Sequence, residues 1–470
     1  MTPSRLHRLR QLGIEPWPAR TRRNLDLQTL VALETPREVP ACGLPVGQAP
    51  ARVLAGRLLA RGETSLTLGD ATTTVELSGG QNLRLWAELE VGDWIEVELV
   101  GSYGREIADL RLLAPCLEFP PTPGPNTAPF GHITPGGGAD LLTLQKRSTL
   151  LHTLRTWFLG QGFVEVETPA LATSPGLEPY LDPFETRWKE HPGAPGEPRY
   201  LLTSPEYAMK RLLVGGLERC FQLSRVFRNG EVGPNHNPEF TLLEWYRALA
   251  SYDEIAEDLQ SLILHMAVSS RVGLTLHRGG HTIDLTPPWE HLTVRDAVQR
   301  YAGFDLAATM DQAGLAKAAA RAGVFCPDNA PWDEIFFRVL MEKVEPHLGY
   351  GKPTFLKDYP APLAALARVR EGEFPVAERF ELYIAGVELA NAFTELNDPV
   401  LQAERFEEER TLRKKMGFPV FEADPAYLAA LRAGLPPTGG IAVGIDRLVM
   451  VLLGAKDVRS VLAFPWQNTP

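Results

Sequence analysis

Residues 221 to 246 read Phe221-Gln-Leu-Ser-Arg-Val-Phe-Arg228, then Asn229-Gly-Glu-Val-Gly-Pro-Asn-His-Asn237, then Pro238-Glu-Phe-Thr-Leu-Leu-Glu-Trp-Tyr246. Two strand-like runs flank a polar loop, so this stretch predicts an antiparallel hairpin. The period of two in a strand places Phe240, Glu244 and Tyr246 on one face. An aromatic ring, an acid and a phenol on one face indicate a polar pocket with a stacking wall. Arg228 ends the first run, where a fixed guanidinium could clamp a phosphate.

Further strand patterns lie on both sides of this hairpin, at 162–169, where Pro169 closes the run, and at 379–396. A helix-like stretch covers 144–160, and a helix-rich insert covers about 251–345. Because the strands form hairpins and the helices are separate from them, the pattern predicts an antiparallel α+β domain. The sequence contains no internal repeat, no P-loop and no G-x-G-x-x-G fingerprint, so neither of those folds would hold a nucleotide here.

The N-terminal quarter has a different character. Five short strands between 52 and 113 suggest a small β-barrel of the OB type. Six arginines within the first 23 residues fit either a solvated amphipathic helix or an acceptor-binding arm. The stretch 119–138 holds six prolines and five glycines, as connectors do. We therefore expect an arm and OB-like domain over 1–115, a Pro/Gly-rich linker over 116–140, and the α+β domain over 141–470.

Composition limits the class of protein. The chain has 470 residues, of which 44% are apolar and 22% charged, as in ordinary globular proteins. The net charge of −11 argues against a protein that coats nucleic acid non-specifically. No apolar run is long enough to cross a bilayer, and no apolar segment follows the N-terminal arginines. The four cysteines are scattered singly, so we expect a cytoplasmic enzyme or binding protein.

Three segments, in order, resemble the signature motifs of the class II aminoacyl-tRNA synthetases, in their lysine-type form. The run 162–169 with its preceding helix resembles motif 1, and Phe227-Arg228-Asn229 with His236-Asn-Pro-Glu-Phe240 resembles motif 2. Gly440-Ile-Ala-Val-Gly-Ile-Asp-Arg447 resembles motif 3. The resemblance implies an antiparallel sheet core with flanking helices, and a homodimer formed through motif 1.

The resemblance also implies ATP binding and adenylate formation. Arg228 would hold the α-phosphate and Arg447 the γ-phosphate, as the two catalytic arginines, and Phe240 would stack on adenine. The implied ATP-binding residues are Arg228, Asn229, Glu231, His236, Asn237, Phe240, Glu381, Leu382, Gly444 and Arg447. The family's motif 2 has glutamate two residues after the arginine, whereas this chain has Gly230 there and Glu231 next. Glu231 would take over if the loop shifts by one residue.

Magnesium would bind at Glu381 and Glu388. The stretch Glu381-Leu-Tyr-Ile-Ala-Gly-Val-Glu388 reads as a tight hairpin that turns near Ala385-Gly386. Such a turn would bring both carboxylates to one sheet face, and like charges this close call for a cation between them. The alternative interpretation is two solvated acids on an edge strand.

Lysine specificity would come from acids that face an ammonium group. A buried pocket that holds several unpaired glutamates demands a cationic ligand. The substrate-binding residues that we expect are Ser204, Pro205, Glu206, Glu244, Tyr246, Glu388, Asn391, Glu395 and Ala442.

Two relatives share this core: lysyl-tRNA synthetase, and the ligase that attaches a lysyl group, usually β-lysine, to a lysine of elongation factor P. The stretches 203–213, 244–247, 351–355 and 376–380 look like the second. Ala442 stands where the tRNA enzyme is expected to have glycine, and its methyl group could favour an amine displaced to the β-carbon.

The N-terminal barrel itself favours the tRNA enzyme, since the elongation factor ligase is usually a bare core. However, single-strand readers depend on aromatic side chains and a positive groove. Ser65-Leu-Thr-Leu68 lacks the aromatic, and Glu76, Glu96 and Glu98 add negative charge. We therefore expect an OB-like domain without anticodon recognition. Transfer to elongation factor P is the leading hypothesis, lysine tRNA the alternative, and a non-catalytic lysine sensor a third that the retained phosphate-binding arginines disfavour.

Overall fold

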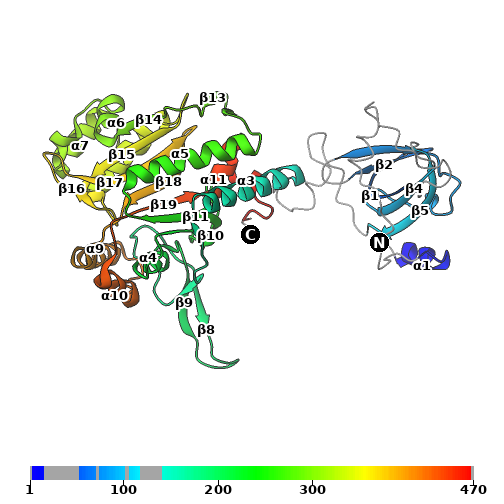
Figure 1. Cartoon of the computed structure of the whole chain (residues 1–470), viewed down its shortest axis with the longest axis horizontal. Helices are drawn as coiled ribbons and strands as arrows, with labels where there is room; N and C mark the ends of the chain where they lie inside the picture. The colour runs from blue at the N-terminus through cyan, green and yellow to red at the C-terminus, as the bar shows by residue number, and fades with distance from the viewer. Residues whose placement is uncertain (1–2, 15–51, 70–72, 101–104, 117–139, 467–470) are drawn as a thin grey trace. The chain divides into compact units, whose positions relative to one another are not determined.

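The computed structural model describes residues 3–14, 52–69, 73–100, 105–116 and 140–466. They belong to two compact units, one within 1–142 and the other within 143–470 (Figure 1). The linker expected at 116–140 lies almost wholly outside the described residues, as do Arg20, Arg22 and Arg23 of the expected arm. None of the helices that are described is both long and apolar enough to cross a membrane.

The N-terminal unit is a five-stranded antiparallel sheet of order β3-β2-β1-β4-β5. Its strands are β1 (Arg52–Arg61), β2 (Ser65–Gly69), β3 (Thr74–Ser78), β4 (Trp94–Leu99) and β5 (Ile107–Ala114). A parallel bridge from Ser78 to Glu106 links β3 to the start of β5 and so joins the two edges. Alternate leucines, such as Leu66 and Leu68, fill the interior, as a small OB-like barrel requires.

Helix α1 (Pro3–Gln11) is anchored to this barrel by a buried ion pair. The Arg5 guanidinium lies 2.7 Å from a carboxylate oxygen of Asp93, and both side chains are buried. Glu96 is also buried, beside Arg111 at 3.8 Å. Glu96 was expected among the surface acids that oppose nucleic acid, and this was wrong, because the side chain is buried, on the face of β4 opposite Ile95 and Val97.

The larger unit is built on a nine-stranded sheet of order β14-β15-β17-β18-β19-β11-β10-β6, with β16 beside β17. The strands are β6 (Val164–Glu165), β10 (Arg219–Phe227), β11 (Glu239–Ala248), β14 (Glu290–Thr293), β15 (Thr354–Pro360), β16 (Val369–Arg370), β17 (Val376–Ile384), β18 (Val387–Thr394) and β19 (Thr438–Gly444). All neighbours pair antiparallel except β14 with β15 and β6 with β10. The α+β fold with an antiparallel core is thereby confirmed.

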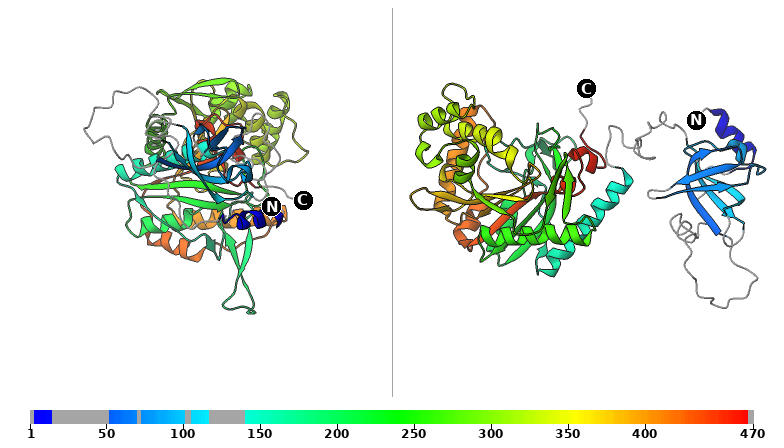
Figure 2. Two further views of the ribbon diagram at one scale, coloured as in Figure 1. Left: turned by 90° about the vertical axis from the view of Figure 1, so that its right-hand side faces the viewer. Right: turned by 90° about the horizontal axis from the view of Figure 1, so that it is seen from above.

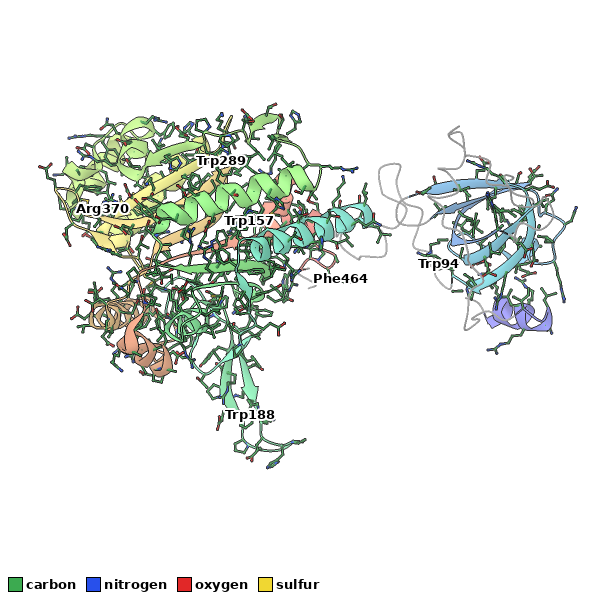
Figure 3. The ribbon with its side chains drawn as sticks, viewed as in Figure 1. Trp94, Trp157, Trp188, Trp289, Arg370 and Phe464 are labelled. Atoms are coloured by element: carbon green, nitrogen blue, oxygen red, sulfur yellow. The ribbon has the colours of Figure 1, made fainter. Side chains whose placement is uncertain are left out.

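Smaller strands and the helices complete this unit. The strands are β7 (Leu171–Ala172), β8 (Glu185–Trp188), β9 (Glu197–Leu201), β12 (Thr275–Arg278) and β13 (His281–Asp284). The helices are α3 (Leu141–Gly160), α4 (Glu206–Val214), α5 (Tyr252–Ser269), α6 (Val294–Tyr301), α7 (Gln312–Arg321), α8 (Trp332–Val339), α9 (Pro399–Met416), α10 (Pro425–Gly434) and α11 (Ile445–Leu452). The β8–β9 hairpin projects from the unit with Trp188 exposed on it (Figure 3).

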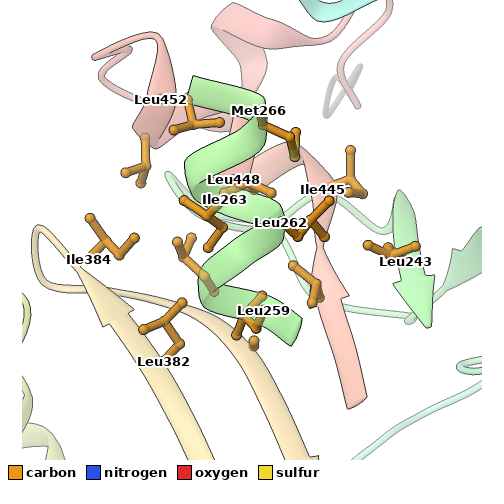
Figure 4. Packing of buried hydrophobic residues seen from close by; sticks show 14 of the residues in the cluster. Leu243, Leu259, Leu262, Ile263, Met266, Leu382, Ile384, Ile445, Leu448 and Leu452 are labelled. Atoms are coloured by element: carbon orange, nitrogen blue, oxygen red, sulfur yellow. The ribbon is translucent and has the colours of Figure 1, made fainter. Parts of the chain in front are cut away.

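Helix α5 lies along one face of the sheet (Figures 1 and 2) and is capped at its N-terminus by Ser251, which forms a capping box with Glu254. Its apolar stripe faces the sheet: Figure 4 shows Leu259, Leu262 and Met266 packed among residues of β11, β17 and α11. Leu243 and Trp245 of β11 belong to this core. The alternate residues of β11 must therefore face the other side, where α4, α9 and α10 pack around Tyr246.

Two expected elements differ from the structure. The strand expected over 162–169 is reduced to Val164–Glu165, because only Cys220 and Phe221 of β10 pair with it. The insert expected to be helical contains α5 to α8 but also β12, β13 and β14. Short apolar runs do not distinguish strand from helix by periodicity, and here sheet pairing decided the outcome.

The β17–β18 hairpin turns at Ala385 and Gly386, as expected, and both residues have positive φ, 54° and 71°. A Cβ on Gly386 would lie 2.5 Å from the Tyr350 hydroxyl oxygen. We expect Gly386→Ala to destabilise the larger unit by about 2–3 kcal/mol, since backbone strain and displacement of Tyr350 add. Gly303→Ala is the control, because Gly303 has φ 81° but no atom within 4 Å of the added Cβ, so it should cost only about 1 kcal/mol. Equal losses of unfolding free energy in the two variants, measured by urea denaturation, would contradict the steric contribution of Tyr350.

Candidate active site

Two cavities meet on the face of the sheet opposite α5. The first, which we call the acidic cavity, has a volume of about 780 Å³ and is lined by Glu206, Glu244 and Glu395 among others. The second, the arginine cavity, is lined by Arg228, Glu231, His236, Phe240, Glu388 and Arg447 among others. Arg228, Leu242, Asn391 and Ala442 line both, so they form a shared wall.

Glu244 is one of the acids that line the acidic cavity. The period of two along β11 turns it away from the apolar core, and its side chain is almost completely buried. The Ser204 hydroxyl donates to Oε1 at 2.6 Å and the Tyr246 hydroxyl donates to Oε2 at 2.9 Å. Burial, with the nearby Glu206 carboxylate, raises the pKa of Glu244 to about 8. Without a bound cation this carboxyl group is therefore mostly protonated at neutral pH.

Glu206 and Glu395 share a cation that the sequence analysis missed. Lys210 is fully buried, one helical turn after Glu206 on α4, and pairs with Glu206; its Nζ lies 2.5 Å from a carboxylate oxygen of Glu395. The expectation that these glutamates are unpaired was wrong, because α4 supplies an internal ammonium. The i, i+4 spacing of Glu206 and Lys210 could have revealed the pair from the sequence.

Lys210 does not neutralise the whole cavity. Glu178 and Glu409 also line it, and neither was identified from the sequence. One carboxylate oxygen of Glu178 is buried without a hydrogen bond. Burial raises the pKa of Glu395 to about 7 and that of Glu409 to about 8. Carboxyl groups that retain protons in this way indicate an excess of buried negative charge, which a cationic ligand would relieve.

The arginine cavity presents two guanidinium groups. Arg447 follows Gly444 in the first turn of α11 and donates to the Asn235 carbonyl oxygen at 3.0 Å and the Glu388 carbonyl oxygen at 3.0 Å. Its Nη2 lies 2.7 Å from His236 Nε2, and burial with this neighbouring charge lowers the pKa of His236. The imidazole therefore stays neutral and accepts the hydrogen bond. Asp446 anchors the helix by accepting from the Thr241 amide at 3.0 Å.

Arg228 lies at the end of β10 with its guanidinium 5.1 Å from the centre of the Phe240 ring. Glu231 lies 4.0 Å from Arg228, so the loop does bring this carboxylate to the cavity despite Gly230. Two arginines beside an aromatic ring and a neutral imidazole form a site suited to a polyanion with a planar ring.

The two carboxylates expected to bind metal lie on the same sheet face, at diagonal positions of β17 and β18. Glu388 lines the arginine cavity, whereas Glu381 is buried and accepts from Arg379 at 2.6 Å and from the Tyr383 hydroxyl at 2.8 Å. Burial and repulsion from both raise the pKa of Glu345 to about 7. No group of three or more His, Cys, Asp or Glu side chains in the described chain is arranged to hold a metal.

Four of the expected residues lie differently. Leu382 is buried in the core under α5 and lines neither cavity, because it faces away from Glu381. Asn229 donates to Asp182 at 2.8 Å and lines neither cavity. The Asn237 side chain lines the arginine cavity but bonds to the backbone of Glu239 and Trp466. Pro205 precedes α4 and lines a third, neighbouring cavity of about 330 Å³.

The sequence pattern described as tRNA synthetases class II (D, K and N) matches residues 141–468. A Lysine--tRNA ligase of Dehalococcoides mccartyi is 39% identical over 69% of this chain and 64% of its own length, so the chain aligns with less than two thirds of that protein. A Lysine--tRNA ligase of Magnetococcus marinus is 32% identical over 98% of this chain and 95% of its own. An Elongation factor P--(R)-beta-lysine ligase of Hamiltonella defensa is 38% identical over 70% of this chain and 96% of its own.

Replacing Lys210 with a neutral side chain would leave Glu206 and Glu395 without their buried cation. We expect Lys210→Met to destabilise the larger unit by roughly 3–5 kcal/mol at pH 8, because two buried carboxylates lose their partner. Burial already raises the pKa of Glu395, and without Lys210 its folded-state pKa lies further above the unfolded value, so the variant retains stability below about pH 5 and loses it as pH rises.

Unfolding free energies at pH 5 and pH 8 test this expectation. Arg338→Met is the matched control, because it breaks the exposed i, i+4 pair with Glu334 at 2.9 Å and should cost less than about 1 kcal/mol at either pH. A loss for Lys210→Met that is small and independent of pH would contradict the interpretation.

Proposed function

The chain belongs to the class II tRNA synthetases of the D, K and N group, and from this premise we propose that it activates lysine or β-lysine with ATP and transfers it to a lysine side chain of elongation factor P. The observation that carries the choice of amino acid is the acidic cavity. Glu178, Glu206, Glu244 and Glu395 are among the side chains that line it, and the buried Lys210 pairs with only two of them, Glu206 and Glu395. An amino acid with an additional ammonium group is the substrate that would offset this charge.

The shared wall supports adenylate formation. A cation-binding cavity borders a polyanion-binding cavity at Arg228, so an amino acid carboxylate and an α-phosphate would meet there. The carboxylate oxygen attacks the α-phosphorus, the new P–O bond forms, and pyrophosphate departs. Arg228 would neutralise the phosphorane charge and Arg447 would hold the γ-phosphate, while Phe240 would stack on adenine. Positioning and charge neutralisation supply most of such catalysis.

Magnesium fits the carboxylates of β17 and β18. Mg²⁺ is usually held by one or two carboxylates, with waters and substrate phosphates as the other ligands, so a larger protein cluster is not required. Glu388, on the cavity wall, and Glu381 behind it would hold the ion, and Glu345 adds a third acid nearby. When bound, the ion would neutralise phosphate charge and help fix the triphosphate.

Ala442 supports β-lysine over lysine. It lies on β19 opposite Glu244 of β11 and Asn391 of β18, and it lines both cavities. Its methyl group occupies the position against which the substrate backbone would rest. A substrate with its amine one carbon further from the carboxylate would relieve that contact.

The barrel surface supports a protein acceptor. The side chains of β1 to β3 that point outward include Arg57, Thr67, Thr74 and Glu76 and no aromatic residue, while the neighbouring strand β4 exposes one ring, Trp94, opposite Arg57. Domains that read single-stranded nucleic acid stack bases on exposed aromatic rings. We therefore propose that this unit does not read an anticodon.

The alternative acceptor is lysine tRNA. It is favoured by the alignment with a Lysine--tRNA ligase over 98% of this chain, which includes the N-terminal unit. Both acceptors act in cytoplasmic translation, where we place the reaction. We also propose a homodimer, since α3 and β6 carry the exposed apolar side chains Leu142, Leu159 and Val164.

The acceptor can be identified directly. Purified protein, ATP, magnesium and labelled β-lysine or lysine are incubated with purified elongation factor P and, in parallel, with total tRNA. We expect label on elongation factor P and more of it from β-lysine. Label on tRNA alone would establish the alternative.

Glu244 provides a test of the amino acid site. A bound ammonium would lower its pKa from about 8, so lysine binding at pH 7 should release protons and affinity should rise as pH approaches 8. Glu244→Gln should release fewer protons and weaken lysine binding by roughly 2–5 kcal/mol with ATP binding intact.

Titration calorimetry in buffers of different ionisation enthalpy measures both quantities. Glu239→Gln is the control, because Glu239 is on the same strand but faces Arg225 at 2.9 Å outside the cavity. Wild-type lysine affinity in Glu244→Gln would refute the assignment of the ammonium site.

A further inference from the structure

The acidic cavity extends well beyond the residues used above. Its outer part is bordered by Tyr180 and Leu181 of the loop before β8, by Met310, Trp332 and Phe337 of the insert, and by Arg405, Glu408, Glu409 and Leu412 of α9. The Tyr180 hydroxyl donates to Asp333 at 2.7 Å and so ties the loop to the insert. A single amino acid bound at Glu244 would leave this outer part free.

The walls of the outer part suit an aliphatic chain that carries a positive charge. Trp332, Phe337, Met310 and Leu412 supply apolar surface, and the Trp332 indole is fixed by donating to the Thr309 carbonyl oxygen at 3.2 Å. Glu408 and Glu409 supply negative charge on the α9 side. A phosphate backbone would be repelled by these acids, whereas a primary ammonium on a methylene chain would be attracted.

Among the described residues, the Glu409 side chain has no hydrogen-bond or ion-pair partner, and the same holds for Glu408, which is the more exposed of the two. The nearby Arg405 instead donates to the carbonyl oxygens of Ala365 and Ala367, the latter at 2.8 Å. Glu409 lines the same cavity as Glu178 and Glu206 and is close enough to both to be affected by their charges.

We propose that the outer acidic cavity is the entry path of the acceptor amine and that Glu409 removes its proton before aminoacyl transfer. This inference rests on the proposed function, because it concerns the second half of that reaction. A lysine side chain would extend through the apolar section and bring its ammonium to Glu409.

The atoms balance as follows. The acceptor R–NH₃⁺ gives one proton to the Glu409 carboxylate and becomes R–NH₂. The amine lone pair attacks the carbonyl carbon of the aminoacyl-adenylate, a C–N bond forms, and the C–O bond to AMP breaks. AMP leaves with the electron pair of that bond, and the second amine proton passes to solvent. An amine with a pKa near 10.4 is almost fully protonated at pH 7, so a positioned base increases the reactive fraction.

The charge environment of Glu409 sets the expected pH dependence. Burial and the charges of Glu178 and Glu206 raise its pKa to about 8. The other charged or titratable groups that face it are Glu408, Arg405, Arg413 and Tyr207. Since the base must be ionised, transfer should accelerate as pH rises to about 8 and then level off.

Single-turnover transfer from preformed adenylate to elongation factor P tests the role. We expect Glu409→Gln to slow transfer about 100-fold or more at pH 8 and to lose the levelling at higher pH, because only the amine's own titration remains. ATP–pyrophosphate exchange should stay within about twofold of wild type. Hydroxylamine, which is largely uncharged at neutral pH, needs no base, so hydroxamate formation from the adenylate should also be retained. Glu407→Gln is the control, because Glu407 is on the same helix but outside the cavity and 68% exposed.

Each other outcome has one meaning. Wild-type transfer by Glu409→Gln would overturn the inference and leave the proposed function standing. Loss of exchange and hydroxamate formation together with transfer would also overturn it, since Glu409 would then act before transfer. If the variant does not fold, a wild-type transfer rate without an inflection near pH 8 would refute the role. Label on tRNA instead of elongation factor P in the wild type would overturn the proposed function and this inference together.

Discussion

Buried carboxyl groups around β11 are incompletely neutralised, and the chemistry of the site depends on that imbalance. Lys210 is shared by Glu206 and Glu395, while Glu244 has only hydroxyl donors, from Ser204 and Tyr246. Ionised carboxylates without partners are costly in a buried site, so the free protein keeps a proton on Glu244, whose pKa is about 8. A cationic substrate would replace that proton, which makes charge the basis of selection.

Packing on the apolar face of the sheet offsets the repulsion among these buried carboxyl groups. Leu243 and Trp245 alternate with Glu244 along β11 and join the core beneath α5, so the strand is held by packing on one side while the other side stays polar. The larger core also fixes β18, β19 and α11, which carry Asn391, Ala442 and Arg447. Burial of this apolar surface stabilises the folded unit, and the repulsion among the carboxylates subtracts from that stability.

The two cavities separate opposite charges and still touch. Arginine side chains gather where phosphates would bind, acids gather where an ammonium would bind, and Arg228 stands on the wall between them. Such a division orients a zwitterionic substrate, because its carboxylate is drawn towards Arg228 and its ammonium groups away from it. The acids of the outer part of the cavity would attract the ammonium group of the acceptor in the same way.

The sequence by itself determined the α+β fold, the β10–β11 and β17–β18 hairpins and the face on which Phe240, Glu244 and Tyr246 lie, because strand alternation and turn chemistry are local properties. It did not determine which charges are compensated. Lys210 was overlooked as the partner of Glu395, Glu381 proved to be held by Arg379, and Glu178 and Glu409 were not identified. Only the tertiary structure decided these points, since Coulomb energy and desolvation depend on distances between residues far apart in the chain.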